Sequence, residues 1–460
     1  MKMGNMIARN YRGTRDWLAG EVLIRQKVID TLRDVFQRFG FEPLETPELE
    51  LYEVLSGKYG PEADELSYNF RKGDDWIGLR YDHTVPLARV AIQHQHEIVL
   101  PYRRYAIGAT FRADEPQPEK GRYRRFIQCD FDTVGIPGPS ADAEVVVLTY
   151  TALRELGFDE FEVQVCDRRL LNGMAKATGA NSKELIVAFL RSWDKIEKTD
   201  RKQIAEELGK AGASPELIAK FFEVTDQLLS LPKEGIIEEL RELFPNQPSV
   251  TEGTAVLEEM LGYIKDFNVP SEFYRVNPCL ARGLDYYTGP IFETVVKKAS
   301  VGSITGGGRF DELIKTLGGP DIPATGSSFG LERIVSVMET LGIAKPQKTA
   351  TQVFVATFNP NSSEMFRKAV QITARLRGEG IKTELNMEKC PIGGQLGIAD
   401  RRGIPIAVFA GPKEMEAKSV VVKDLRIPFG SATQKQQWVN QWKIPEESLI
   451  EKVKELLKPT

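Results

Sequence analysis

The strongest constraint on the fold comes from residues 106–134, which read as two strands joined by a long loop. Residues 106–112 and 125–134 have strand-like patterns, and the stretch between them includes two prolines and a glycine. Because side chains alternate between the two faces of a strand, Gln128, Asp130 and Asp132 share one face. The sequence therefore predicts a hairpin that presents amide and carboxylate groups on the same side.

Arginine side chains surround the loop of this hairpin. Arg112 ends the first strand, and Arg122 and Arg124 lie across the loop. Their planar guanidinium groups suit bidentate contacts with phosphate, but a surface hairpin with solvated charges is an equally open interpretation. Together with a second distinctive stretch, CLARGLDYYTG at 279–289, the hairpin suggests a site for a nucleotide and a small cationic or amine-bearing molecule.

Length and composition predict a globular protein of several domains. The chain has 460 residues, of which 42% are hydrophobic and 27% charged, enough for two to four domains with separate cores. No apolar run reaches the ~18 residues of a membrane helix, and the first residues lack the apolar core of a signal peptide. We therefore expect a cytoplasmic protein without a membrane segment.

The cysteines and histidines argue against several kinds of site. The four cysteines are far apart and form no Cys-x-x-Cys pair, so reduced, buried thiols are expected: Cys129, Cys166, Cys279 and Cys390. The three histidines are His83, His94 and His96. The last two lie on different faces of an expected helix, which disfavours a shared metal site. A histidine-based triad is also disfavoured, because the sequence has no Gly-x-Ser-x-Gly elbow.

The first 343 residues have the pattern of an antiparallel sheet interrupted by helices. Helices are expected at 21–39 (ended by Gly40), 83–97 and 140–156, a hairpin at 67–80, and strands at 161–166, 273–277, 290–297 and 302–305. A Lys- and Glu-rich helical insertion is expected at about 170–265. This order predicts an α+β fold. The glycines at 306–308 form either a tight turn or a close approach of the backbone to a ligand or strand.

A second domain is expected after a short linker. Residues 344–350 have linker composition, and residues 351–460 alternate strand and helix patterns. This predicts a small α/β domain with a largely parallel sheet. Residues 351–460 carry more Lys and Arg than Asp and Glu, which is compatible with a phosphate-backbone partner but common on ordinary surfaces.

Several motifs in this order resemble those of class II aminoacyl-tRNA synthetases. They are GTRDW at 13–17, LRYDHTVPLAR at 79–89, the arginine hairpin at 111–135, ARGLDYYTG at 281–289, GGGRFDELI at 306–314 and GLERI at 330–334. The RGLDYYTG segment resembles a signature of the histidyl-tRNA synthetase family in particular. The resemblance implies a catalytic domain at 1–343 with a six-stranded antiparallel sheet and a helical insertion, followed by an α/β anticodon-binding domain at 351–460.

The resemblance also implies which residues bind the nucleotide. Arg112 matches the arginine that grips the ATP α-phosphate, and Arg333 matches the one that holds the γ-phosphate. Arg282 matches an arginine placed near the α-phosphate and the amino-acid carboxylate. Arg112 and Arg282 are thus the expected catalytic residues. Glu115 lies in the loop that meets the adenine ring, although it could equally be a solvated loop charge.

The amino-acid site follows in the same way. Asp82, Thr84 and Gln128 match positions that hold the α-ammonium group. Asp132 and Tyr287 match positions that read the imidazole ring, and Arg282 would contact the carboxylate. Discrimination by such paired polar groups is strong, because a ligand that lacks the matching groups leaves buried polar atoms unpaired.

Two neighbours of Tyr287 have weaker expectations. Asp285 is more typical of a turn residue than of a substrate contact. Tyr286 points away from Tyr287, toward the core, if the segment is extended.

The implied function is ATP-dependent ligation of L-histidine to its tRNA through a histidyl-adenylate, with Mg²⁺ accompanying ATP and its ligands unassigned. Pro47 resembles a dimer-interface motif, which implies a homodimer, or it is an ordinary strand-edge proline. One alternative is a synthetase-like regulatory subunit of ATP phosphoribosyltransferase, disfavoured by the retained arginines and C-terminal domain. Another is a class II synthetase for a different amino acid, disfavoured by Asp132 and Tyr287.

Overall fold

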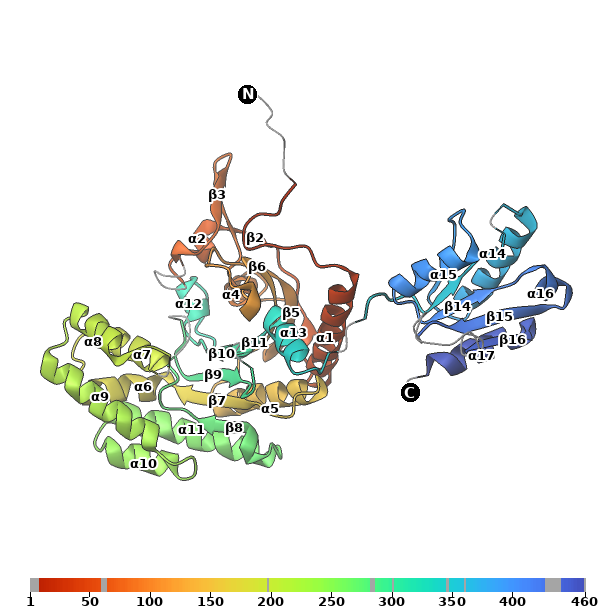
Figure 1. Cartoon of the computed structure of the whole chain (residues 1–460). Coiled ribbons are helices and arrows are strands. Elements are labelled where there is room, and N and C mark those ends of the chain that lie inside the picture. The colour runs from red at the N-terminus through yellow and green to blue at the C-terminus, as the bar shows by residue number, and fades with distance from the viewer. Residues whose placement is uncertain are drawn as a thin grey trace. The chain divides into compact units, whose positions relative to one another are not determined.

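The chain forms two compact units. The computed structural model describes residues 8–58, 64–196, 198–281, 286–299, 302–344, 347–359, 361–426 and 440–458. One unit comprises Met1–Asp16 and Lys27–Ala344, and the other comprises Trp17–Gln26 and Lys345–Thr460. Figure 1 shows the elements of both units along the chain. No helix in the described part of the chain combines the length and apolar character needed to span a bilayer.

An eight-stranded sheet forms the centre of the first unit. In spatial order its strands are β1 (Glu42–Pro43), β5 (Tyr102–Phe111), β6 (Arg125–Val134), β11 (Ala324–Gly330), β10 (Thr305–Arg309), β9 (Pro290–Val295), β7 (Glu162–Asp167) and β8 (Tyr274–Val276). Neighbours from β5 to β7 are antiparallel, whereas β1 pairs with β5 and β8 pairs with β7 in parallel.

The predicted six-stranded antiparallel sheet is therefore wrong, because two short edge strands make the sheet larger and mixed. The chain leaves β1 and returns to its neighbour β5 only after a separate hairpin and a helix, and it leaves β7 and returns in β8 only after the whole helical insertion. Parallel neighbours require such long crossover connections. The two- and three-residue edge strands were too short to recognise by alternation.

The predicted hairpin at 106–134 is confirmed, although β5 begins at Tyr102. Its register pairs Gly108 with Gln128, Ala106 with Asp130, and Arg104 with Asp132. Gln128, Asp130 and Asp132 all line one cavity, as the alternation predicts. The hairpin thus places a row of polar side chains along one face of the sheet.

Helices bury the opposite face. Helix α1 (Ala19–Arg38) places Val28, Leu32 and Phe36 in the core, and the Phe36 ring lies 5.4 Å from that of Phe131 on β6. Helix α13 (Leu331–Thr340) contacts β6, and α5 (Pro139–Glu155) contacts β11 and β7 (Figure 1). Burying one such side chain contributes roughly 1.5–3 kcal/mol. Gly40 follows α1 with φ of 77°, in the left-handed conformation expected of a helix-ending glycine.

The remaining predicted elements of this unit are largely present. The predicted hairpin at 67–80 is formed by β3 (Asn69–Lys72) and β4 (Asp75–Leu79), with β2 (Leu49–Leu51) beside β4. Helix α4 (Thr84–Gln93) ends four residues earlier than the predicted 83–97. The strand expected at 302–305 is misplaced, because β10 begins at Thr305 and contains the glycines 306–308.

The insertion is helical, as its composition predicts. Its helices are α6 (Arg168–Thr178), α7 (Lys183–Lys195), α8 (Arg201–Lys210), α9 (Pro215–Ser230), α10 (Ile236–Leu243) and α11 (Pro248–Asp266). Ser182, Asp200 and Ser214 cap α7, α8 and α9 by accepting hydrogen bonds from backbone N–H groups. The buried Trp193 ring stacks on Phe221 at 5.6 Å, which gives the insertion an aromatic core.

The second unit has a five-stranded sheet in the order β13 (Thr383–Leu385), β12 (Val353–Val355), β14 (Ile406–Phe409), β15 (Ser419–Asp424) and β16 (Gln441–Pro445). Its helices include α14 (Ser363–Gly378), α15 (Ile392–Arg401) and α17 (Leu449–Leu457). The prediction of a largely parallel sheet is only half right, because β14–β15 and β15–β16 are antiparallel. Only the short α16 (Pro412–Glu416) joins β14 to β15, too little chain for a parallel crossover.

Three of the four cysteines are buried as expected. They are Cys129, Cys166 and Cys279, whereas Cys390 is half-buried. Cys390 precedes α15 in a loop of the smaller unit, where less structure covers it.

Candidate active site

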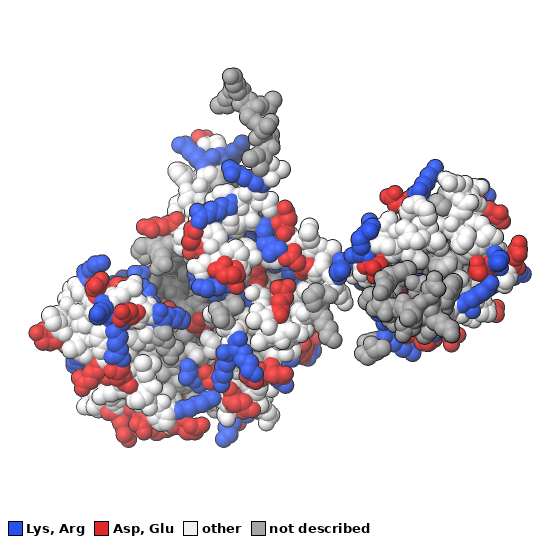
Figure 2. Space-filling model, in the orientation of Figure 1, with Lys and Arg blue, Asp and Glu red and all other residues white. Residues whose placement is uncertain are grey.

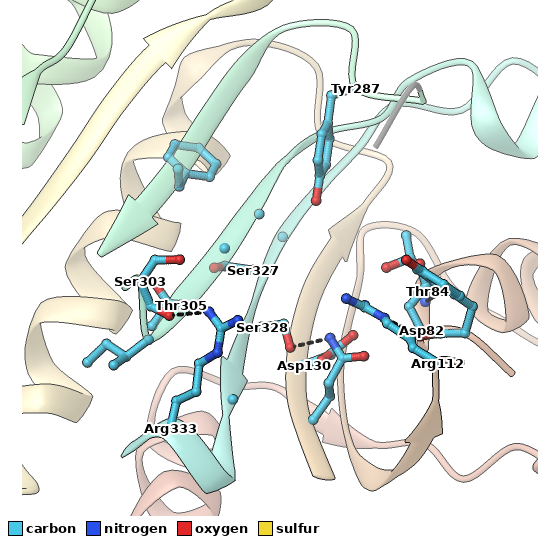
Figure 3. Close-up of a pocket in the computed structure, with 18 of the residues that line it drawn as sticks. Asp82, Thr84, Arg112, Asp130, Tyr287, Ser303, Thr305, Ser327, Ser328 and Arg333 are labelled. Atoms are coloured by element: carbon cyan, nitrogen blue, oxygen red, sulfur yellow. Dashed lines mark hydrogen bonds between the residues drawn. The ribbon is translucent and has the colours of Figure 1, made fainter. Parts of the chain in front are cut away.

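A cavity of about 630 Å³ lies on the polar face of the eight-stranded sheet (Figure 3). It brings together most of the residues that the sequence singled out: Asp82, Thr84, Arg112, Gln128, Asp132, Tyr287 and Arg333. They come from the start of α4, the hairpin β5–β6, the segment before β9 and the start of α13. Arg282 and Asp285 lie outside the described residues.

Glycines on β10 and β11 make room for this cavity. A Cβ atom on Gly326 would lie 2.2 Å from Asp132 Oδ1, and one on Gly308 would lie 2.7 Å from Tyr287 Cδ1. A Cβ atom on Gly307 would lie 2.1 Å from the carbonyl oxygen of Gly326 on the neighbouring strand. The glycines at 306–308 therefore serve close approach within the sheet rather than a tight turn.

The two predicted phosphate-binding arginines line different parts of the cavity: Figure 3 shows Arg112 beside Asp82, and Arg333 beside Ser303. The Arg112 guanidinium lies over the Tyr81 ring at 4.2 Å and the Phe126 ring at 5.2 Å, and its Nε donates to the Tyr81 carbonyl at 3.3 Å. Arg333 donates from Nη1 to the Ser303 carbonyl at 2.6 Å. Aromatic rings or backbone atoms thus hold each guanidinium in place at the cavity wall.

The backbone around Arg333 ties the start of α13 to the hairpin. The Glu332 carboxylate accepts from the Ile127 N–H at 3.1 and 3.0 Å. Gly121 in the hairpin loop has φ of 66°, and a Cβ atom there would lie 3.0 Å from the backbone nitrogen of Arg333. The loop that follows Arg112 therefore packs directly on the helix turn that carries Arg333.

Asp82 both lines the cavity and caps a helix. Its Oδ1 accepts from the N–H groups of Thr84 at 2.9 Å and Val85 at 3.1 Å, at the start of α4. Its Oδ2 accepts from the Tyr286 hydroxyl at 3.1 Å. Burial raises the pKa of Asp82, while the Val85 N–H and Arg112 act to lower it.

The prediction that Tyr286 belongs to the core is confirmed in part, because its ring packs 5.9 Å from that of the buried Phe310, but its predicted separation from the site is wrong. Tyr286 lines the cavity and bonds Asp82, while Tyr287 lines the same cavity. The alternation rule does not apply here, because these residues precede β9 and are not part of a strand.

Asp132 is paired with a buried arginine. The Nη2 of Arg104, which is fully buried, lies 2.7 Å from Asp132 Oδ2. Burial nevertheless raises the pKa of Asp132 to about 7, because the cost of desolvating the carboxylate exceeds the opposing effect of Arg104. Tyr287 points into the cavity (Figure 3), and burial raises the pKa of its phenol, which keeps it a neutral donor.

Other lining residues were missed by the sequence interpretation. Two of them are Ser328 and Asp130. Ser328 Oγ on β11 accepts a hydrogen bond from Gln128 Nε2 at 2.8 Å, and Asp130 lies between Gln128 and Asp132 on β6. Alternation placed Asp130 on the polar face but suggested no role for it. Helix α7 adds Arg191 and Lys195 of the insertion to the lining, and no sequence signal connected them to the site.

Two loop residues have different surroundings. Glu115 does not line the cavity; it is exposed and forms an ion pair with Arg12. Arg122 does line the cavity, and its Nη1 lies 3.8 Å from Asp114 Oδ2. The predicted contact of Glu115 with a nucleotide stays a prediction.

Comparison with protein families gives two matches that cover most of the chain. Residues 13–334 match the family model described as histidyl-tRNA synthetase, and residues 352–456 match the anticodon binding domain. The histidine–tRNA ligase of Gloeobacter violaceus is 38% identical over 92% of this chain and 97% of its own length.

Solved structures give a consistent comparison. The histidyl-tRNA synthetase of Nostoc sp. PCC 7120 superposes with a TM-score of 0.82 at 26% identity, over 98% of this chain and all of its own. A Bacillus halodurans protein described as an ATP phosphoribosyltransferase regulatory subunit/histidyl-tRNA synthetase has a TM-score of 0.68 at 21% identity, covering 84% of this chain and 94% of that one. The second likeness concerns the fold alone.

Proposed function

Since the chain belongs to the histidyl-tRNA synthetase family, we propose that the cavity on its eight-stranded sheet is where histidine reacts with ATP. The enzyme catalyses the ATP-dependent ligation of L-histidine to tRNA through a histidyl-adenylate. The observation that carries the proposed site is the meeting, in one cavity, of Arg112 and Arg333 with Asp82, Asp132 and Tyr287. Two cations suit a triphosphate, and the carboxyl and phenol groups suit an amine and an imidazole.

The arginines stabilise charge during adenylate formation. A carboxylate oxygen of histidine attacks the α-phosphorus of ATP, and pyrophosphate leaves with the electron pair of the broken P–O bond. Arg112 binds the α-phosphate and Arg333 the γ-phosphate, so negative charge that develops in the transition state meets cations already in place. Arg282, matched to the family motif, is the proposed partner of the α-phosphate and the carboxylate.

Other residues of the cavity select the amino acid. Asp82, Thr84 and Gln128 hold the ammonium group. Asp132 faces one imidazole nitrogen and Tyr287 the other, as acceptor and donor. A side chain of similar size without these nitrogens leaves both groups buried and unpaired, at about 1–3 kcal/mol each.

Mg²⁺ accompanies ATP in this proposal and neutralises phosphate charge. Such ions are commonly held by phosphate oxygens and water together with few carboxylates. Glu332, the carboxylate next to Arg333, already accepts two hydrogen bonds from Ile127 N–H. We therefore assign the ion no protein ligand. Glu115 remains the proposed contact of the adenine end.

The tRNA is proposed to contact both units. We propose a catalytic domain at 1–343, a linker at 344–350 and an anticodon-binding domain at 351–460, working in the cytoplasm. Lys and Arg are interspersed with Asp and Glu over the visible surface (Figure 2). The proposed tRNA contacts therefore rest on the family rather than on one basic patch.

A homodimer is proposed from an apolar surface near Pro47. Leu49 and Leu51 on β2 are half exposed, and Val99 is 82% exposed in the segment after α4. A second cavity, of about 730 Å³, is lined by Pro47 and Val99 among others. Exposed apolar side chains near a motif that resembles a dimer interface support the proposal. The mass of the protein in solution, measured by light scattering, should be that of two chains.

Pyrophosphate exchange tests the proposed activity. Each amino acid is supplied in turn with ATP and labelled pyrophosphate, and histidine alone should drive exchange. Exchange driven by a different amino acid, or by none, would contradict the proposal. The regulatory-subunit alternative has less support, because the curated ligase from Gloeobacter violaceus matches the chain over nearly its full length.

A further inference from the structure

Asp130 is a buried carboxyl group for which the proposed function has no use. It is 3% exposed, lies between Gln128 and Asp132 on β6, and lines the cavity. Its Oδ1 is buried and accepts no hydrogen bond from the described residues. A buried carboxyl that serves only the fold usually has its oxygens bonded. The unbonded oxygen at a cavity wall therefore indicates a missing donor.

Ser328 connects Asp130 to Gln128. Ser328 on β11 pairs directly with Asp130 on β6, so the two side chains stand opposite each other on one face. Ser328 Oγ accepts a hydrogen bond from Gln128 Nε2 at 2.8 Å. This leaves the hydroxyl proton of Ser328 for Asp130, the residue labelled beside it in Figure 3. The Ser328 hydroxyl and Arg104 both lower the pKa of Asp130, but burial outweighs them and raises it to about 6.

The direction of the Gln128 amide follows from this contact. Because Nε2 is used by Ser328, Oε1 is the atom left to face the ligand. Gln128 Oε1 is buried and has no donor among the residues that the structure describes. Two acceptor atoms without donors, Gln128 Oε1 and Asp130 Oδ1, thus lie on the same wall of the cavity.

The charge around this wall calls for a cation. Asp82, Asp130 and Asp132 are all buried and line the cavity. The fully buried Arg104 is paired with Asp132. In the proposed reaction Arg112 is used by the α-phosphate. A ligand that brings an ammonium group supplies both the positive charge and the N–H donors.

We propose that Asp130 and Ser328 complete the ammonium site of the amino-acid substrate. Asp130 accepts a hydrogen bond from the ammonium group, and Ser328 is a positioning residue that turns the oxygen of Gln128 toward the same group. This inference rests on the proposed histidine-activating function, and it adds two residues to the amine-binding set.

Two inhibitors of histidine-dependent exchange separate the ammonium contact from the rest of the site. Histidinol keeps the ammonium and imidazole groups and lacks the carboxylate. 3-(Imidazol-4-yl)propanoate keeps the imidazole and carboxylate and lacks the ammonium. Inhibition constants are measured for the wild type, Ser328→Ala, Asp130→Asn and the control Ser336→Ala on α13. If histidine drives no exchange in the wild type, the proposed function fails before this inference is reached.

The inference predicts a selective loss. Ser328→Ala and Asp130→Asn should raise the inhibition constant of histidinol by about tenfold or more, which is the effect of losing one hydrogen bond to a charged group. The inhibition constant of the propanoate should change by less than about twofold. The KM for histidine should rise while the KM for ATP stays within about twofold, and Ser328→Thr should restore part of the histidinol affinity. Unchanged histidinol binding, or equal loss for both inhibitors, would overturn the inference.

Discussion

The cavity holds two groups of residues with opposite electrostatics, named here by their proposed roles: the phosphate end (Arg112 and Arg333) and the amino-acid end (Asp130 and Asp132). At the phosphate end, rings and carbonyl groups hold the guanidinium groups of Arg112 and Arg333. At the amino-acid end, Asp130 and Asp132 have pKa values raised by burial to about 6 and about 7. The amino-acid end therefore titrates near neutral pH, and its buried carboxylates make the empty protein less stable.

The largest effect is expected at the phosphate end. Arg112→Ala should lower kcat of exchange by about 10²–10³, because it removes a preorganised cation from the developing charge. Arg112→Lys should recover little, since an ammonium group cannot make the same bidentate contact or stack on Tyr81 and Phe126. Arg125→Ala, at an exposed position of the same hairpin, is the matched control. Exchange by Arg112→Ala within about tenfold of the wild type would remove its catalytic role.

Asp132→Asn should weaken the use of histidine rather than that of ATP. The isosteric change removes the charge paired with Arg104 and replaces one acceptor oxygen by an NH₂ donor, so the KM for histidine should rise by about 10- to 100-fold. The KM for ATP should stay within about threefold. Exchange kinetics with each substrate varied in turn check this, and Asp74→Asn, at an exposed turn, is the control. A parallel rise of both KM values would mean that the two ends are not separate.

The two ends should differ in their pH dependence. As pH falls from 8 to 6, Asp132 and then Asp130 become protonated, so the KM for histidine should rise by several-fold while the KM for ATP changes less. The imidazole of free histidine titrates in the same range. Asp132→Asn isolates the contribution of Asp132, because this variant keeps the titrations of free histidine and of Asp130 and loses only that of Asp132. Identical pH profiles for Asp132→Asn and wild type would contradict the assignment.

The smallest effect is expected in the stability of the ligand-free protein. The folded-state pKa of Asp130 is raised, so the associated stability is present below pH 4 and is lost as pH rises through about 6. Asp130→Asn removes this loss of free energy of unfolding, which is up to about 3 kcal/mol. The variant should therefore melt about 2–4 °C higher than the wild type at pH 8, with a smaller difference at pH 5. Thermal melts at the two pH values check the sign, with Asp74→Asn as the control.

Local pattern predicted the parts of this site that lie on single elements. Alternation in β6 placed Gln128, Asp130 and Asp132 on one face. The GLERI motif pointed to Arg333, which lines the cavity. The pairing between strands that are distant in the chain could not be predicted from the sequence. The register that sets Ser328 opposite Asp130, and the approach of Gly326 to Asp132, depend on a sheet assembled from remote segments. The parallel edge strands β1 and β8 were missed for the same reason.

Tyr286 and helix α7 show which residues of the site sequence periodicity does not predict. Tyr286 was assigned to the core by an alternation that holds only in strands, yet its hydroxyl bonds Asp82. Arg191 and Lys195 lie on an amphipathic helix of the insertion, and their place at the cavity follows only from how that helix packs.

A crystal structure with histidine and a non-hydrolysable ATP analogue tests the central claim most directly. The account predicts the triphosphate on Arg112 and Arg333, the imidazole between Asp132 and Tyr287, and the ammonium group within hydrogen-bond distance of Gln128 Oε1 and Asp130 Oδ1. Histidine bound with its ring at the arginine end, or a nucleotide bound away from both arginines, would contradict it.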